Sequence, residues 1–266
     1  MVIYSHTRLS LYENCPLAYR FRYLDKIKPA VPFIGIEAFM GSCVHDTLEY
    51  LYKRRMHTSL DRIDDGELMA YYRNTWDRKM SDDVKIVKEG MTEADYFESG
   101  KQILKNYYDR YAPFEEDRTL FVEKRMDFTI DGFRMIGYPD RIARKSDGTY
   151  LIHDYKTSGT LPTAEHLKAD RQLALYLIGL DQSIPEAAES PKELVYHYLR
   201  FGEEFRIRRT GEDIESVKKN VVGLIKTVEL ASWENNFPAV VGSRCAWCEF
   251  LRECPAMKRQ TKTGTR

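Results

Sequence analysis

An acid and an amine stand two residues apart in the segment LIHDYKTSG, which runs from Leu151 to Gly159. Most of the segment has the apolar character of a buried strand. Side chains alternate between the two faces of a strand, so Asp154 and Lys156 point to the same face and Tyr155 points to the other, where we expect it to pack in the core. The pair can be a half-exposed ion pair of little energetic worth, or it can belong to a site that handles a charged substrate.

A second carboxylate, Asp140, follows Pro139 on the preceding predicted strand. If the two strands are neighbours, Asp140 and Asp154 lie close together, and nearby carboxylates repel one another unless a cation lies between them. Oxygen-rich sites suit Mg²⁺ or Mn²⁺, which can activate water and bind a phosphoryl oxygen. Lys156 could orient that water or neutralise charge on the phosphate. The pattern therefore indicates hydrolysis of a phosphodiester.

The elements that must position these residues predict an α/β fold. Asp131-Gly132 and the 146–148 turn favour a meander of three antiparallel strands. The resulting order of elements predicts a mixed central sheet flanked by helices. We expect helices over residues 5–21 (interrupted near Pro16), 39–55, 163–180 and 213–233, and strands over residues 120–130, 133–144, 150–157, 193–200 and 204–209. We divide the chain into an N-terminal helical part of the core (1–55), a helical insertion (56–118), the core proper (119–240) and a C-terminal segment with a basic tail (241–266).

Composition narrows the function classes. The 266 residues contain 41 Lys and Arg against 41 Asp and Glu, so the net charge is zero and a global basic field is absent. Any nucleic acid must therefore bind in a local groove. No segment has the length and apolarity of a membrane span. The polar N-terminus is unlike a signal peptide, and we expect a cytoplasmic protein.

The PD of residues 139–140, followed by the DYK of residues 154–156, resembles the signature of the PD-(D/E)XK nucleases. Two further motifs resemble the RecB-like and Cas4-like branch of that superfamily. Gly41 to His45 matches its G-x-x-x-H helix, in which the histidine is a metal ligand, and Gln172 to Tyr176 matches its Q-x-x-x-Y motif.

This resemblance implies a restriction-endonuclease-like core. It implies that His45, Asp140 and Asp154 bind the metal ion. It also implies that the catalytic set is Asp140, Asp154, Lys156, Gln172 and Tyr176. By residue type alone, His45 could equally be a buried core histidine, and the glutamine–tyrosine pair could be a polar edge on a core helix. Glu123 could be an extra carboxylate of the site or a solvent-facing strand residue, and we leave it outside the predicted set.

The cysteines form a separate pattern. Cys245, Cys248 and Cys254 lie in one short span, and Cys15 would supply a fourth ligand from the other end of the chain. Four thiolates suit tetrahedral zinc or a [4Fe–4S] cluster. The one-plus-three split, with prolines after Cys15 and Cys254, resembles the cluster arrangement of Cas4-like and AddB-like nucleases. The resemblance therefore implies [4Fe–4S], with zinc as the alternative. An odd cysteine count argues against a secreted disulfide scaffold, and we expect the fifth cysteine, Cys43, in the core.

The expected function is that of a metal-dependent DNA nuclease, an exonuclease that acts on single-stranded ends in DNA repair, recombination or CRISPR adaptation. Its expected partners are DNA and a helicase, CRISPR or repair protein. The alternative is a non-catalytic or partner-dependent subunit that binds DNA ends, with the cysteines holding zinc or a structural cluster.

Overall fold

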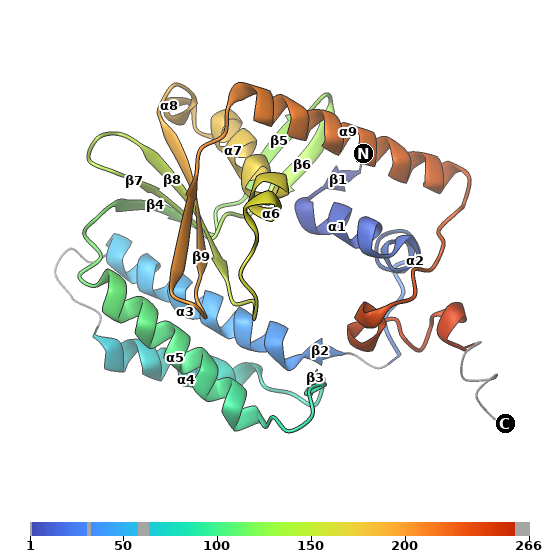
Figure 1. The fold of residues 1–266 in the computed structure, drawn as a ribbon, viewed down its shortest axis with the longest axis horizontal. Coiled ribbons are helices and arrows are strands. Elements are labelled where there is room, and N and C mark those ends of the chain that lie inside the picture. The colour runs from blue at the N-terminus through green and yellow to red at the C-terminus, as the bar shows by residue number, and fades with distance from the viewer. Residues whose placement is uncertain (1, 31–32, 58–63, 259–266) are drawn as a thin grey trace.

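A mixed five-stranded sheet forms the centre of the computed structural model, which describes residues 2–30, 33–57 and 64–258. The strand order is β10-β9-β8-β7-β4 (Figure 1). β8 and β9 are parallel, and the other neighbours are antiparallel. The strands are β4 (Arg118–Val122), β7 (Arg141–Arg144), β8 (Tyr150–Lys156), β9 (Lys192–Tyr198) and β10 (Glu203–Ile207). The expected mixed α/β core with flanking helices is confirmed.

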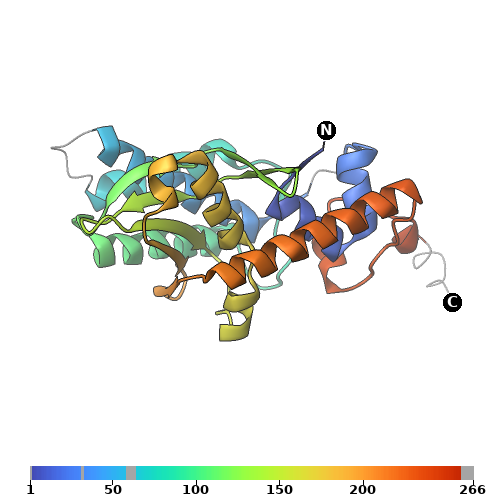
Figure 2. The same ribbon diagram turned by 90° about the horizontal axis from the view of Figure 1, so that it is seen from above.

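Helices cover both faces of this sheet, as Figures 1 and 2 show. On one face lie α3, α4 and α5, whose core includes Tyr155 of β8. On the other lies α7, whose core includes Ile152 of the same strand. The central strand is therefore buried on both sides, as parallel strands usually are. The helices are α3 (Ile36–His57), α4 (Asp65–Lys79), α5 (Glu93–Tyr111), α6 (Ala164–Ala169), α7 (Gln172–Ser183) and α8 (Pro185–Ala188).

A second, three-stranded sheet with the order β1-β6-β5 packs against α7. It consists of β1 (Ile3–Tyr4), β5 (Met126–Ile130) and β6 (Phe133–Gly137). β5 and β6 form the hairpin expected at Asp131-Gly132, where both residues have positive φ, of 46° and 81°. Asp and Gly tolerate this left-handed conformation better than most residues.

The expected three-strand meander is wrong, because each of its first two strands is broken and shared between the two sheets. The 120–130 segment breaks at Glu123, which has a φ of 48°. The 133–144 segment breaks around Pro139, which has no N–H to donate to a ladder. The single helix expected over residues 163–180 is also wrong. It divides into α6 and α7 at Asp170 and Arg171, where the Asp170 carboxylate accepts a hydrogen bond from the Gln172 N–H at 2.6 Å.

The N-terminal and C-terminal segments lie side by side, at the right of Figure 1. The Leu17 N–H donates to the Pro238 carbonyl at 3.3 Å, and Arg244 donates to the Asn14 side chain. These segments contain α1 (His6–Asn14), α2 (Pro16–Tyr19), α9 (Gly211–Trp233) and a short 3₁₀ helix (Ser243–Trp247). The expected basic tail beyond residue 258 lies outside the described residues. Among the described helices, none is long and apolar enough to cross a membrane.

Candidate active site

The acid and amine of β8 lie in direct contact on the face that α7 covers. The Lys156 ammonium Nζ is 2.6 Å from Asp154 Oδ2 and donates to Gln172 Oε1 at 2.7 Å. Gln172 in turn donates to the Tyr176 hydroxyl at 3.2 Å. The Q-x-x-x-Y pair therefore shares one face of α7, as its spacing requires, and holds the amine of Lys156. Asp154 is 2% exposed, so its charge is compensated by Lys156 and not by water.

The peptide of Tyr155 contacts two further polar side chains of the site. Its N–H donates to Asp140 Oδ2 at 2.6 Å, and its carbonyl lies 2.8 Å from His45 Nε2. A carbonyl only accepts, so His45 carries a proton on Nε2. Its Nδ1 lies 3.3 Å from Asp140 Oδ1. A hydrogen bond on one ring nitrogen sets the tautomer and leaves the other nitrogen for a metal ion.

Glu123 completes this group. One ligand atom from each of His45, Glu123 and Asp140 lies within 4.8 Å of the others. The Glu123 N–H also donates to the Asp140 carbonyl at 3.1 Å, so the two residues are fixed to one another. Two carboxylates and one imidazole fit the ligand preferences of Mn²⁺ and, less closely, Mg²⁺. The sequence-based set named Asp154 in place of Glu123. In the structure, the Asp154 carboxylate faces Lys156 and lies beside this group.

Without a metal ion, the pKa values of three side chains in the site are raised, an arrangement that suits the binding of a cation. Burial opposes protonation of His45, but the Asp140 carboxylate outweighs it and raises the His45 pKa to about 9. Burial and the neighbouring Asp140 charge raise the pKa of Glu123 to about 7. Burial raises the pKa of Asp154 to about 6, although Lys156 acts in the opposite direction. A divalent ion would favour the deprotonated form of each group and displace these protons.

Close approaches between elements explain two of the glycines near the site. A Cβ on Gly41 would lie 2.7 Å from Thr157 Oγ1, so only glycine lets α3 approach the residue that follows Lys156. A Cβ on Gly137 would lie 2.9 Å from the Tyr176 ring. The glycine of the G-x-x-x-H motif therefore sets the distance between the helix of His45 and the end of β8.

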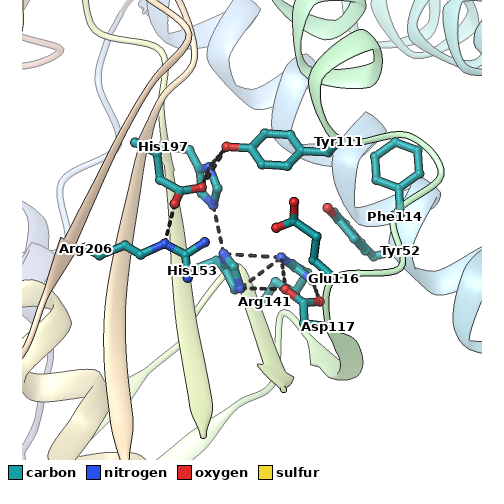
Figure 3. A pocket seen from close by; sticks show the side chains of 10 residues that line it. Tyr52, Tyr111, Phe114, Glu116, Asp117, Arg141, His153, His197 and Arg206 are labelled. Carbon is teal, nitrogen blue, oxygen red and sulfur yellow. Dashed lines mark hydrogen bonds and ion pairs between the residues drawn. The ribbon is translucent and has the colours of Figure 1, made fainter. Parts of the chain in front are cut away.

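A buried polar chain lies on the opposite face of the same strands (Figure 3). Arg141 forms a two-point ion pair with Asp117, at 2.5 and 3.2 Å, and donates to His153 Nε2 at 2.8 Å. His153 Nδ1 is 2.8 Å from His197 Nε2, and His197 Nδ1 is 3.1 Å from the Tyr111 hydroxyl, which donates to Glu204 at 2.8 Å.

Because the arginine can only donate, this chain has one direction. His153 accepts on Nε2 and donates from Nδ1, and His197 does the same. Burial and the nearby Arg141 charge lower the pKa of both histidines well below the usual value, which keeps both rings neutral. Arg141 directly follows Asp140, and His153 directly precedes Asp154. Arg141 and His153 are register partners on β7 and β8. Their contact therefore links the two strands next to Asp140 and Asp154.

The four cysteines of the sequence pattern, Cys15, Cys245, Cys248 and Cys254, line one cavity of about 460 Å³ between the N-terminal and C-terminal segments. The other three thiols contribute to raising the pKa of Cys248, an effect that is led by burial. The fifth cysteine, Cys43, is buried in the core beside α4 and α5, as expected.

Comparisons with known proteins identify the family of the chain and relate its fold to a solved structure. A model of the PD-(D/E)XK nuclease superfamily matches residues 3–255. A search of curated proteins gave no significant match. Among solved structures, the chain is similar to a "Putative exonuclease" from Eubacterium rectale, with 14% identity, a TM-score of 0.50, and coverage of 99% of this chain and 94% of that one. It is also similar to SSO0001, with 17% identity, a TM-score of 0.35, and coverage of 94% and 95%. Because the family match spans nearly the whole described chain, the protein belongs to the PD-(D/E)XK nuclease superfamily.

Proposed function

We propose that this nuclease is a metal-dependent DNA exonuclease that hydrolyses phosphodiester bonds at single-stranded ends. The observation that carries the proposal is the juxtaposition of two groups. Possible metal ligands from His45, Glu123 and Asp140 converge within 4.8 Å, and the Asp154–Lys156 pair lies beside them. The predicted metal ligands His45 and Asp140 are kept and Glu123 is added. Asp154 is retained as a further ligand, with one carboxylate oxygen in contact with Lys156.

A bound Mg²⁺ or Mn²⁺ would polarise the scissile phosphate and acidify a water molecule. The protein's own groups then have separate tasks. The Lys156 ammonium orients the attacking water and offsets charge on the phosphate. Asp154 and Gln172 hold that ammonium in one position, at 2.6 and 2.7 Å. Tyr176 fixes the Gln172 amide, so that its oxygen faces the amine. Positioning of this kind is worth orders of magnitude in rate.

The preference for single-stranded DNA ends, the pathway (repair, recombination or CRISPR adaptation), a helicase or other protein partner, and a cytoplasmic location remain parts of the proposal. The name of the E. rectale neighbour is in keeping with an exonuclease. A second candidate is a subunit that binds DNA ends and cleaves only with a partner, or not at all. The exposure of Trp233 at 83% and Leu230 at 53% on α9 favours a protein partner for this chain.

For the cysteine cavity we propose a [4Fe–4S] cluster that ties the two chain ends together, with zinc as the alternative. The one-plus-three split of these cysteines, with prolines after Cys15 and Cys254, is the pattern that favours the cluster. Either group would be held by the four thiols that line this cavity. Removal of the group should lower the melting temperature, because the link joins residues 15 and 245. Colourless protein that contains zinc would favour the alternative, and an unchanged melting temperature after removal of the group would contradict a structural link of either kind.

The test of the main proposal is a cleavage assay on end-labelled single-stranded DNA, with the purified protein and Mn²⁺. We expect shortening from an end, and loss of cleavage in Lys156→Ala and Asp140→Ala with little change in circular dichroism. Lys101→Ala is the matched control, since Lys101 is an exposed lysine paired with Glu98 on α5. Full activity in both site variants would rule out this mechanism. Tight binding of DNA ends by the parent protein without cleavage would favour the second candidate.

A further inference from the structure

A cavity of about 640 Å³ opens beside the site, and its wall contains residues that the proposed chemistry does not use. Asp154, Lys156 and His45 form one part of the wall. Lys88, from the loop before α5, and Arg200, from the turn after β9, form another. The helical segment between α3 and β4 is therefore part of the site and not a separate appendage.

The charges in this cavity divide into two kinds. Lys156 is paired with Asp154, and His45 is paired with Asp140. Lys88 and Arg200 are both exposed, and neither has an ion pair with a carboxylate in residues 2–30, 33–57 or 64–258. The remaining lining carboxylate, Glu37, accepts a hydrogen bond from the Tyr96 hydroxyl at 2.7 Å. In the described part of the chain, these two cations have no carboxylate partner, and they face a cavity suited to a polyanionic substrate.

The helix α3 indicates where Arg200 lies relative to the metal ligands. Glu37, Gly41 and His45 recur every four residues and lie along one side of this helix. Arg200 acts electrostatically on Tyr96, which binds Glu37. Eight residues of helix separate Glu37 from His45, which is about 12 Å. Arg200 therefore lies toward the Glu37 end of the cavity, away from His45, and Lys88 lines the same cavity from the loop before α5.

We propose that Lys88 and Arg200 bind the phosphodiester backbone of the DNA strand at phosphates that flank the scissile one. This inference rests on the proposed function for the identity of the strand. A strand bound in this cavity contacts Lys88 from the loop before α5 and Arg200 from the turn after β9. Contacts of this kind position a strand without reading its sequence.

The test compares Lys88→Ala and Arg200→Ala with two controls, Lys85→Ala and Arg118→Ala, which remove exposed cations that do not line the cavity. We expect KM for single-stranded DNA to rise roughly tenfold in each cavity variant, as for a lost charge-assisted hydrogen bond, with kcat changed little. The slope of log(kcat/KM) against log[salt] should become less steep by about 0.7 per lost phosphate contact. Both controls should match the parent.

Binding separates this inference from the proposed chemistry. Anisotropy of a labelled oligonucleotide is measured in the Lys156→Ala background, with and without Lys88→Ala or Arg200→Ala. If the parent protein does not cleave, weaker binding with a smaller salt slope in the added variants still supports the two contacts. Unchanged affinity and salt slope overturn them, even if the parent cleaves DNA. A fall in kcat with an unchanged KM would also overturn them, because the cations would then act on the reacting phosphate.

Discussion

The substitution Gly41→Ala tests whether the packing of α3 on the end of β8 sets the geometry of the metal ligands. The added Cβ would lie 2.7 Å from Thr157 Oγ1, about 0.7 Å short of the 3.4 Å at which ordinary contacts begin. Either Thr157 moves, which disturbs the neighbouring Lys156, or α3 moves. His45 lies one turn further along α3 and is 3.3 Å from Asp140, so movement of the helix opens that contact.

Two contributions to the free energy of unfolding act in opposite directions in Gly41→Ala, and a control variant separates them. Overpacking costs about 1–3 kcal/mol. Replacement of a helical glycine by alanine gains about 1 kcal/mol from propensity alone. Gly223→Ala on α9 is the matched control, because a Cβ there meets nothing within 4 Å. It should stabilise the protein by about 1 kcal/mol. Gly41→Ala should therefore be less stable than Gly223→Ala by about 1–3 kcal/mol, measured by urea unfolding.

Gly41→Ala should lower activity more than it lowers stability. A displacement approaching 1 Å among positioned groups can cost about 100-fold in rate, so we expect kcat/KM to fall by one to two orders of magnitude, with weaker Mn²⁺ binding. Thr157→Ala removes the clashing oxygen and leaves a side-chain atom 3.8 Å away. The double variant should recover most of the Mn²⁺ affinity that Gly41→Ala loses, relative to Thr157→Ala alone. If Gly41→Ala matches Gly223→Ala in stability and the parent in Mn²⁺ affinity, the packing argument is wrong.

Three further predictions concern the site and the opposite face of its strands. Binding of Mn²⁺ must displace the proton of His45, whose pKa is about 9, and that of Glu123, whose pKa is about 7. Affinity measured by calorimetry should therefore fall about tenfold per pH unit from pH 9 to 7 and more steeply below, and a flat profile would contradict these assignments. The His45 charge stabilises the metal-free fold fully below pH 6.5, and this contribution is lost as the pH rises through 9. Replacement of Arg141 by methionine strands the Asp117 carboxylate and should cost about 3–5 kcal/mol in urea unfolding. The exposed-strand control Arg118→Met should cost little, and a loss below 1 kcal/mol for the Arg141 variant would show that the ion pair is dispensable.

Periodicity could predict part of the site because that part obeys local rules. Strand alternation places Asp154 and Lys156 on one face, and the four-residue spacing of Gln172 and Tyr176 places both on one side of a helix. These relations depend only on local geometry. The structure adds the hydrogen bond between Gln172 and Lys156, which joins the two predictions and depends on how α7 packs on the sheet.

Glu123 shows where such rules end. The sequence pattern treats Glu123 as a strand residue, but its φ of 48° takes it out of the strand. Strand alternation therefore does not predict where its side chain points. The irregular link between β4 and β5 turns its carboxylate toward Asp140. The same link moves β5 into the second sheet, although the alternation along residues 120–130 suits a single continuous strand. The Asp140 carbonyl, which accepts from the Glu123 N–H at 3.1 Å, is the tertiary contact that the sequence does not reveal.

The two faces of β7 and β8 explain why polar residues crowd these short strands. Asp154 and Lys156 face the candidate site, where Lys156 contacts Gln172 of α7. Tyr155, between them, and His153, before them, point to the other face, where Tyr155 packs with α3 and α5. A carboxylate site holds its shape poorly without a cation, because its charges repel. Contacts on the face toward α3 and α5 fix the two strands even when no cation is bound. Arg141 holds His153 across the strands, and the Tyr155 hydroxyl lies 3.2 Å from a second buried tyrosine on α5. The Tyr155 peptide that orients both Asp140 and His45 is thus anchored from behind. Residues on the face toward α3 and α5 should therefore affect metal affinity only by setting the distances between the metal ligands. Substitutions there should weaken metal binding although the substituted side chains do not contact the ion.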